Sequence, residues 1–535
     1  MVVVWVCFAV RLLFYSAMLP LWEGYDEWAH FAVIRHMAVD GKLLVDRQEP
    51  VPRDVEASFQ LAAVPWEMRS LPPPSLTQDR YWELSREERE RRQRALQEMP
   101  AAWGREEGSG AFPSYEALQP PLYYWMMAPA LLACRALGAG LAGEVLVLRF
   151  LSALVASLVV PLIFLIGRQV WDGGRAAVGC AAIAAVMPGL ALDVARVGND
   201  CLAVVLFTGL TWLMLKLVRE GVTLRLAMAT GVVLGLGLLT KAYFLTAVPA
   251  VLVVLIYACW RAPGERRDTV ARALLLVSAG LLLSGWWYLR NLRTTGTLSG
   301  LSEAVMLRGA SPTQMLRQAA SLNWAKAIDA IFFSHLYFGG WSSLTVRSWM
   351  YHLFYVAILA AAVGLLRLPR LPAILTLLLI YLAFWTGQLY NVALLYLSKG
   401  LAGSMGWYMY AVAGAEVTLA VAGLRRLLPA RADRWIAPAG AALFALLDLY
   451  TVHGVAIPYY TGMIRHRANG SLTALHWAAL QSVGVGEAFQ RLTAGKGPLL
   501  SVPMLVFLWL LYLGATATAV ACARRPKNDD PISAP

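Results

Sequence analysis

Long apolar segments recur along the whole chain and constrain its fold more than any other feature. There are thirteen, at residues 2–21, 121–138, 144–166, 175–192, 199–219, 225–240, 243–260, 271–289, 351–367, 371–390, 406–424, 436–453 and 499–522. A helix rises about 1.5 Å per residue, so about 20 residues cross a bilayer core. With 59% hydrophobic and only 15% charged residues, the chain cannot be an ordinary soluble domain. The sequence predicts an all-α polytopic membrane protein with about 12–13 transmembrane helices.

Basic residues are concentrated in alternate connections between these segments. The chain has 46 Lys+Arg and 33 Asp+Glu, a formal charge of +13. The basic connections contain Arg168 and Arg175; Arg219 and Arg225; Arg261, Arg266, Arg267 and Arg272; Arg367 and Arg370; Arg425, Arg426, Arg431 and Arg434; and Arg524, Arg525 and Lys527. The positive-inside rule predicts that this set is cytoplasmic, which explains the excess charge without a nucleic-acid partner.

One apolar segment must fail to cross if the loop 22–119 lies outside and Arg168 inside. Segment 121–138 is the best candidate, because it begins with Pro120-Pro121, contains Pro129 and carries Arg135 near its end. We predict an interfacial or re-entrant helix there, leaving about twelve true spans. The alternative, a full span at 121–138, would require a compensating change elsewhere in the topology.

The same topology leaves three long outer loops, at 22–119, 290–350 and 454–498. Within the first, the run 78–107 is dense in Arg and Glu, which predicts a surface helix with local ion pairs. The predicted organisation is a catalytic transmembrane module at 1–300, an outer loop at 301–350 and a C-terminal transmembrane module at 351–535. The long outer loops are expected to carry interfacial helices.

Polar residues gather at the outer ends of several predicted spans. Asp26, Glu27 and His30 follow the first; Arg196 to Asp200 precede the span at 199–219; Lys241 interrupts two apolar runs; Arg290 closes another. Each has an ordinary explanation, such as a helix cap or a snorkelling side chain. Together they suggest group transfer, in which a carboxylate accepts a proton and cations hold a phosphate. His30 and Asp200 are also candidate ligands for a divalent metal ion.

Five motifs in this order resemble the GT-C glycosyltransferases. They are Asp26-Glu27, Gln119-Pro120-Pro121-Leu122-Tyr123-Tyr124, Asn199-Asp200, Thr240-Lys241 and Trp286-Trp287-Tyr288-Leu289-Arg290-Asn291. The resemblance is closest to bacterial members similar to protein O-mannosyltransferases and aminoarabinose transferases, the family 39-like enzymes, and it covers residues 1–300.

The resemblance implies an inverting transferase of the cell envelope. It would move a sugar from a polyprenyl-phosphate donor to a lipid, glycan or protein acceptor, at the outer or periplasmic face of the plasma (inner) membrane. Asp26 would be the general base, with Glu27 in reserve and Asp200 as the second acid. Lys241, Arg290, Asn199, Tyr123 and Tyr408 would contact the donor. Membrane lipids are the other expected partners, and no cofactor beyond a divalent metal is implied.

Two features keep other functions open. Related proteins often have Gly-Arg-Tyr at a late span, whereas this chain has Gly406-Trp407-Tyr408, so a non-catalytic subunit with the same fold is one alternative. Arg11 and Glu416 are charged residues within predicted spans, as in a transporter or lipid flippase. Their similar depths suggest the hypothesis that they pair with each other. The alternative is that each separately meets a carbonyl, a hydroxyl or water.

Overall fold

The computed structural model of the chain describes residues 1–535 except 42, 44–47, 370, 497–498 and 525–535. Helices dominate it, and the strands in the described part are two short ones, β1 (Ala63–Val64) and β2 (Leu76–Thr77), which pair in parallel. The prediction of an all-α protein is therefore confirmed.

Nine described helices are long and apolar enough to cross a membrane. They are Leu141–Val170 (α7 with α8), α11 (Asp200–Glu220), Ala242–Arg261 (η3 with α13), α14 (Arg266–Thr295), α18 (Ser348–Leu365), α19 (Pro372–Lys399), Gly406–Leu427 (η6 with α20), Ala430–Tyr460 (η7, α21, η8 and α22) and α24 (Val502–Ala523). A tenth span is broken, with a bend of 64° between α9 (Gly174–Ala185) and α10 (Pro188–Val194). The chain is a multi-pass membrane protein.

Two predicted spans and the predicted interfacial segment are represented by shorter helices. The apolar helices α1 (Val2–Met18) and α12 (Leu224–Leu238) have 17 and 15 residues. Helix α6 (Leu122–Ala136) has 15 residues, which is about 22 Å and less than a hydrocarbon core of about 30 Å. It contains Pro129 and packs against α2 (Glu27–Val39) and α7 (Leu141–Ala156). Because α12, a predicted span, is equally short, the interfacial position of α6 stays a prediction.

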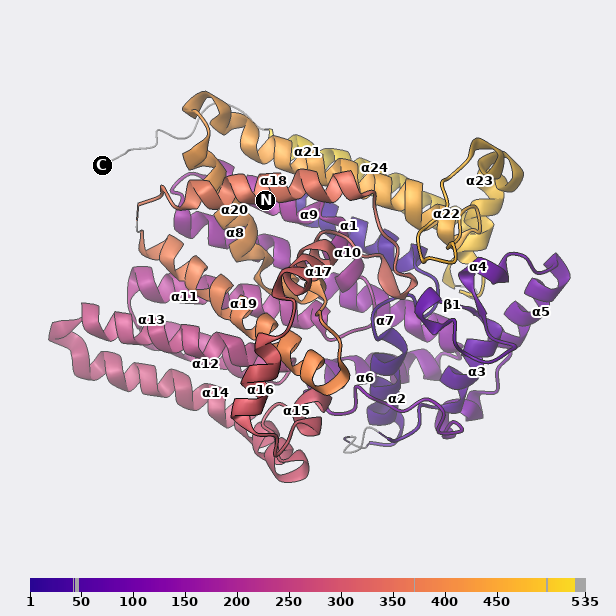
Figure 1. Cartoon of the computed structure of the whole chain (residues 1–535), viewed down its shortest axis with the longest axis horizontal. Coiled ribbons are helices and arrows are strands. Elements are labelled where there is room, and N and C mark those ends of the chain that lie inside the picture. Colours follow the sequence, from indigo (N-terminus) through magenta and orange to yellow (C-terminus); the bar gives the residue numbers. More distant parts are fainter. Residues whose placement is uncertain (42, 44–47, 370, 497–498, 525–535) are drawn as a thin grey trace.

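The three long loops that the sequence predicts to be outer, called the outer loops below, contain helices, as predicted. The first carries α2, α3 (Arg53–Leu61), α4 (Gln78–Tyr81) and α5 (Arg86–Gln97); the second carries α15 (Ser302–Met306), α16 (Pro312–Ala320) and α17 (Trp324–Leu336); the third carries α23 (Trp477–Thr493). In α5, Glu88 pairs with Arg91 and Arg92, which confirms the expected local ion pairs. Helices α3–α5 and α23 lie together on the right of Figure 1, opposite the turn between α13 and α14.

A buried ion-pair network fixes the first outer loop to the membrane helices. The guanidinium of Arg35 on α2 lies 2.8 Å from Asp54 on α3 and 2.5 Å from Glu144 on α7. Breaking such a buried network is costly, so the loop is held in one position over α7.

Helix α1 packs against α24, α7 and α9, so the two ends of the chain share one core. The boundaries of the predicted modules at 1–300 and 351–535 remain a prediction. Arg11 on α1 is fully buried, and its Nη2 atom lies 2.5 Å from Asp448 on α21 (Asp433–Tyr450). Tyr15 and Tyr512 each donate a hydrogen bond of 2.6 Å to the same carboxylate.

The hypothesis that Arg11 pairs with Glu416 is wrong. Glu416, on α20 (Ala413–Leu427), instead lies 2.8 Å from His335 on α17. The reason is the arrangement of the helices in the membrane plane. Helix α1 packs on α24, which contacts α21, whereas α20 packs against α18. Equal depth in the membrane therefore did not imply contact.

We expect Arg11→Leu and Asp448→Leu each to destabilise the protein by about 3–5 kcal/mol, because each leaves a buried charge alone. The double variant should recover much of that loss, which thermal unfolding in detergent would measure. Strictly additive losses would contradict the pairing.

Candidate functional site

Asp26 lies in a tight reversal between α1 and α2. Trp22 and Asp26 both have left-handed backbone angles, with φ of 66° and 54°. Asp accepts this conformation more readily than most residues, although it still carries strain. The side chain is partly exposed, and Oδ1 accepts a hydrogen bond of 2.5 Å from the Tyr115 hydroxyl. The Tyr115 hydrogen bond therefore fixes one oxygen of the Asp26 carboxylate, and the carboxylate can still accept a further hydrogen bond or a proton.

Asp200 holds two cations in place. Its carboxylate lies 2.7 Å from Nη2 of Arg196 and 2.5 Å from Nζ of Lys241. Asp200 is also the first residue of α11, where the helix dipole favours a negative charge. Because both oxygens already face cations, Asp200 is better suited to positioning Arg196 and Lys241 than to accepting a proton.

Asp193, Arg196, Asp200 and Lys241 form one ion-pair cluster, and Arg196 is its buried centre. Nη2 contacts Asp193 at 2.9 Å as well as Asp200, while Nε and Nη1 have no hydrogen-bond partner within the described residues. Two glycines make room for it: a Cβ on Gly24 would lie 2.7 Å from Cβ of Arg196, and a Cβ on Gly198 would overlap Nη1. These unpaired donors could bind an anion.

The cluster controls the charge of its neighbours. Burial raises the pKa of Asp26, whereas the Tyr115 hydrogen bond and the charges of Arg196 and Lys241 oppose that rise. Burial, assisted by the same two cations, holds the pKa of His30 well below its usual value. The neutral imidazole is therefore favoured, and its Nδ1 lies 2.9 Å from the Tyr124 hydroxyl.

Glu27, although adjacent to Asp26, has a different environment. Its two oxygens accept hydrogen bonds of 2.7 and 2.6 Å from Arg149, and one also accepts from the backbone N–H of Val197 at 3.0 Å. Arg149 in turn donates to the carbonyls of Leu19 and Pro20 at 2.6 Å. Glu27 is fully buried and joins α1, α7 and the loop that carries Arg196. Its geometry is that of an anchor.

The other predicted residues support this arrangement. Tyr123 bonds to Ser152 at 2.9 Å and accepts from the N–H of Gly198 at 3.0 Å. Asn199 donates to the carbonyl of Thr240, which precedes Lys241, at 3.1 Å.

Arg290 extends from α14, stacks over the Trp287 ring at 4.6 Å and donates to Asn291 at 3.4 Å. The loop that follows α14, at residues 297–301, lines the cavity described below.

The residues do not fit a divalent metal well. Among the described residues no group of three or more His, Cys, Asp or Glu side chains is placed to hold one. The candidate Asp200 faces two cations, and the candidate His30 is bonded to Tyr124. A metal requirement stays an untested prediction, and the chemistry considered below needs none.

A cavity of about 460 Å³ opens beside Lys241. Tyr408 lines it, with its ring 5.1 Å from Nζ of Lys241. The remaining lining combines amides and hydroxyls with apolar side chains, including Gln119, Gln388, Asn391, Thr297, Leu298, Leu307, Met315, Phe384 and Leu394. A cationic side chain among apolar ones suits an amphiphilic ligand.

Trp407 occupies the position at which an arginine was expected from the resemblance. Its ring stacks on Tyr25 at 3.7 Å, and Arg196 lies 5.5 Å from the same Tyr25 ring. Trp407 therefore packs against the cluster instead of adding a charge to it.

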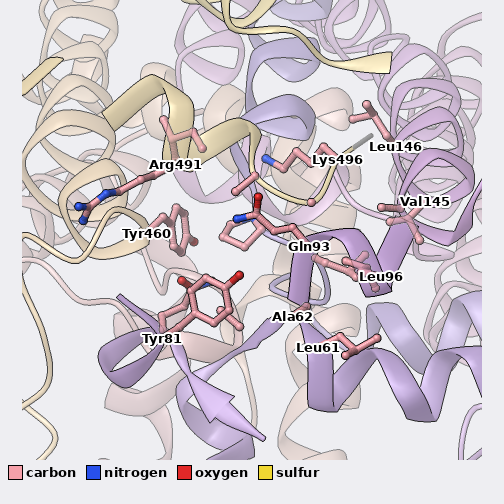
Figure 2. A pocket seen from close by; sticks show the side chains of 18 of the residues that line it. Leu61, Ala62, Tyr81, Gln93, Leu96, Val145, Leu146, Tyr460, Arg491 and Lys496 are labelled. Carbon is pink, nitrogen blue, oxygen red and sulfur yellow. The ribbon is translucent and has the colours of Figure 1, made fainter. Parts of the chain in front are cut away.

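A second, smaller cavity of about 60 Å³ lies between the first outer loop, α7 and the last outer loop. Figure 2 shows Tyr81, Gln93, Tyr460 and Lys496 around it. Lys496 is buried and donates to the carbonyls of Ala17 and Met18 at the end of α1; burial lowers its pKa. This cavity lies on the side of Arg149, so it adjoins the Glu27 anchor.

Sequence reasoning missed three residues of the site. Arg196 was part of a recognised motif but was not assigned a role, although an arginine beside two carboxylates at i−3 and i+4 was a usable signal. Tyr115 and Arg149 carried no local signal, because their partners lie 89 and 122 residues away.

A family model described as "Predicted membrane protein (DUF2142)" matches residues 8–413, which contain the whole cluster. The chain belongs to this family. No curated protein matches this DUF2142 chain.

Two solved structures are similar to the DUF2142 chain. ArnT from Cupriavidus metallidurans, bound to undecaprenyl phosphate, has 17% identity over 98% of this chain and 77% of its own, with a TM-score of 0.48. The Archaeoglobus fulgidus oligosaccharyltransferase, in complex with Zn and sulfate, has 14% identity over 82% and 52%, with a TM-score of 0.38.

The contrast between the adjacent carboxylates can be tested by stability. We expect Glu27→Gln to lower the free energy of unfolding by about 3 kcal/mol, because it weakens a buried pair with Arg149. Asp26→Asn should cost under about 1 kcal/mol, since the site is partly exposed and Asn tolerates the same backbone angles. Thermal unfolding of both variants in detergent measures this difference. Equal losses would show that the two carboxylates have the same role.

Proposed function

We propose that the protein is an inverting membrane glycosyltransferase. It moves a sugar from a polyprenyl-phosphate donor to a hydroxyl of a lipid, glycan or protein acceptor. The observation that carries this proposal is the position of Asp26, a partly exposed carboxylate beside two cations that Asp200 holds together. A proton acceptor next to a phosphate-sized positive site is what this transfer requires.

Each group has a distinct role in the proposed reaction. Asp26 accepts the proton of the acceptor hydroxyl while the oxygen of that hydroxyl attacks the anomeric carbon of the sugar. The bond from that carbon to the phosphate oxygen breaks, and the phosphate leaves with the electron pair. Lys241 and the unpaired Nε and Nη1 of Arg196 stabilise the negative charge that develops on the phosphate. Attack opposite the leaving group inverts the anomeric centre.

The cavity beside Lys241 supports a lipid-linked donor. Lys241 contributes a cationic side chain to its lining, and Phe384, Leu394 and Met315 contribute apolar ones. A polyprenyl phosphate combines the matching groups, an anionic head and an apolar chain. The bound undecaprenyl phosphate of ArnT is a ligand of this chemical class.

The proposed membrane location rests on the distribution of basic residues among the loops. We place the protein in the plasma membrane with the cluster facing outward, because Asp26 and Lys241 belong to the loops opposite the arginine-rich turns. A transporter is less favoured, since Arg11 is satisfied by Asp448 and Glu416 by His335.

The direct test offers the purified protein a panel of radiolabelled polyprenyl-phosphate sugars with membrane acceptors. We expect transfer from one donor, and we expect Asp26→Asn to lower its rate by about 10²–10⁴ with an unchanged melting temperature. Asp329→Asn, which alters an exposed carboxylate on α17, is the matched control and should retain full activity. Transfer from none of the donors, or full activity in Asp26→Asn, would refute the proposal.

The pH dependence tests the role of the Tyr115 hydrogen bond. Asp26 must be deprotonated to act as a base, so activity falls as the pH drops below its pKa. The bond from Tyr115 opposes the rise in that pKa, and Tyr115→Phe should therefore shift the acid limb of the pH–rate profile to higher pH.

Tyr355→Phe removes a comparable Tyr–Asp hydrogen bond, to Asp329, and should leave the profile unchanged. An acid limb that stays in place or moves to lower pH in Tyr115→Phe would contradict the assignment of Asp26.

A further inference from the structure

Helices α13 (Ala247–Arg261) and α14 form a hairpin with an open groove between them. Figure 1 shows both helices at the left of the molecule, joined by a turn at its edge. The groove has a volume of about 710 Å³ and an apolar lining that includes Leu252, Ile256, Val270, Leu274 and Val277. Ile256 and Leu274 are 69% and 63% exposed, although both belong to membrane-spanning helices. These side chains therefore face the surrounding lipid.

One end of the groove is positively charged. Arg266 lines it, and Arg261, Arg267 and Arg272 lie in the same turn region. The acidic residues of this region are two, Glu265 and Asp268, so the basic residues outnumber them. Arg272 lies 4.0 Å from Glu265. Arg266 and Arg267 are exposed, and neither has an ion pair within the described part of the chain.

The dimensions of the groove match one leaflet of a bilayer. Trp260 is 77% exposed at the basic end, where an aromatic side chain marks the boundary between membrane and water. From there the lining continues for eight residues of α13 to Leu252 and eleven residues of α14 to Val277. At about 1.5 Å per residue this is roughly 12–16 Å, close to half of a hydrocarbon core of about 30 Å.

We infer that this groove binds a membrane phospholipid with an anionic headgroup. The headgroup phosphate lies against Arg266, which lines the groove, and near Arg267, which lines the adjoining hollow together with Arg266. An acyl chain follows Ile256 and Leu274 into the membrane. Charge complementarity selects an anionic lipid, because basic pockets between transmembrane helices favour such headgroups. The length of the lining selects a phospholipid over a small anion. The inference does not depend on the proposed transferase activity.

The test uses the full-length protein in nanodiscs made from equal amounts of phosphatidylcholine and phosphatidylglycerol, with native mass spectrometry of the released protein. We expect the wild type to retain phosphatidylglycerol in preference to phosphatidylcholine. Retention should fall about tenfold in the double variant Arg266→Gln/Arg267→Gln, because two cations near the headgroup are lost. The matched control, Arg367→Gln/Arg431→Gln, removes two exposed arginines from other basic turns and should retain the lipid.

A second variant separates a lipid from headgroup attraction alone. Ala273→Trp fills the groove without a change in charge and should also reduce retention. The inference is overturned if Ala273→Trp retains the lipid, if the Arg266/Arg267 variant equals its control, or if both phospholipids are retained alike. Displacement of the lipid by free glycerol phosphate would show an anion site only and would also overturn it.

Discussion

The carboxylate of Asp200 bridging Arg196 and Lys241 is the interaction on which the rest of the site depends. These three residues come from a loop, the start of α11 and the break between α12 and η3 (Ala242–Thr246). Two buried cations would repel each other without the carboxylate, and a lone carboxylate would be costly to bury. The bridge therefore fixes the ends of several membrane helices relative to one another and presents positive charge to Asp26.

Other buried ion pairs link the loops to the membrane helices. Glu27 and Arg149 join the reversal before α2 to α7, and Arg35 with Asp54 and Glu144 docks the first outer loop on the same helix. In membrane surroundings such charges find partners inside the protein, because lipid offers none. The outer loops are consequently part of the site's framework, and Tyr115 reaches Asp26 from one of them.

The helices and most of the site could be predicted because both correspond to local patterns in the sequence. Apolar length predicts a span, and alternating basic turns gather Asp26, Asp200 and Lys241 at one side. What could not be predicted was lateral packing: the sequence gives the depth of Arg11 but not its neighbour, Asp448. Within the described residues nine or ten helices are long enough to span, fewer than predicted, because Pro188 bends one segment and others are short.

The central claim is that the cluster around Arg196 and Lys241 receives the phosphate of a polyprenyl-phosphate donor. The most direct measurement is a cryo-electron microscopy structure of the protein in nanodiscs with added undecaprenyl phosphate. Our account predicts the phosphate between Lys241 and Arg196, within reach of Asp26, and the polyprenyl chain in the cavity lined by Tyr408 and Phe384. A phosphate bound elsewhere, with this cavity free of the polyprenyl chain, would contradict it.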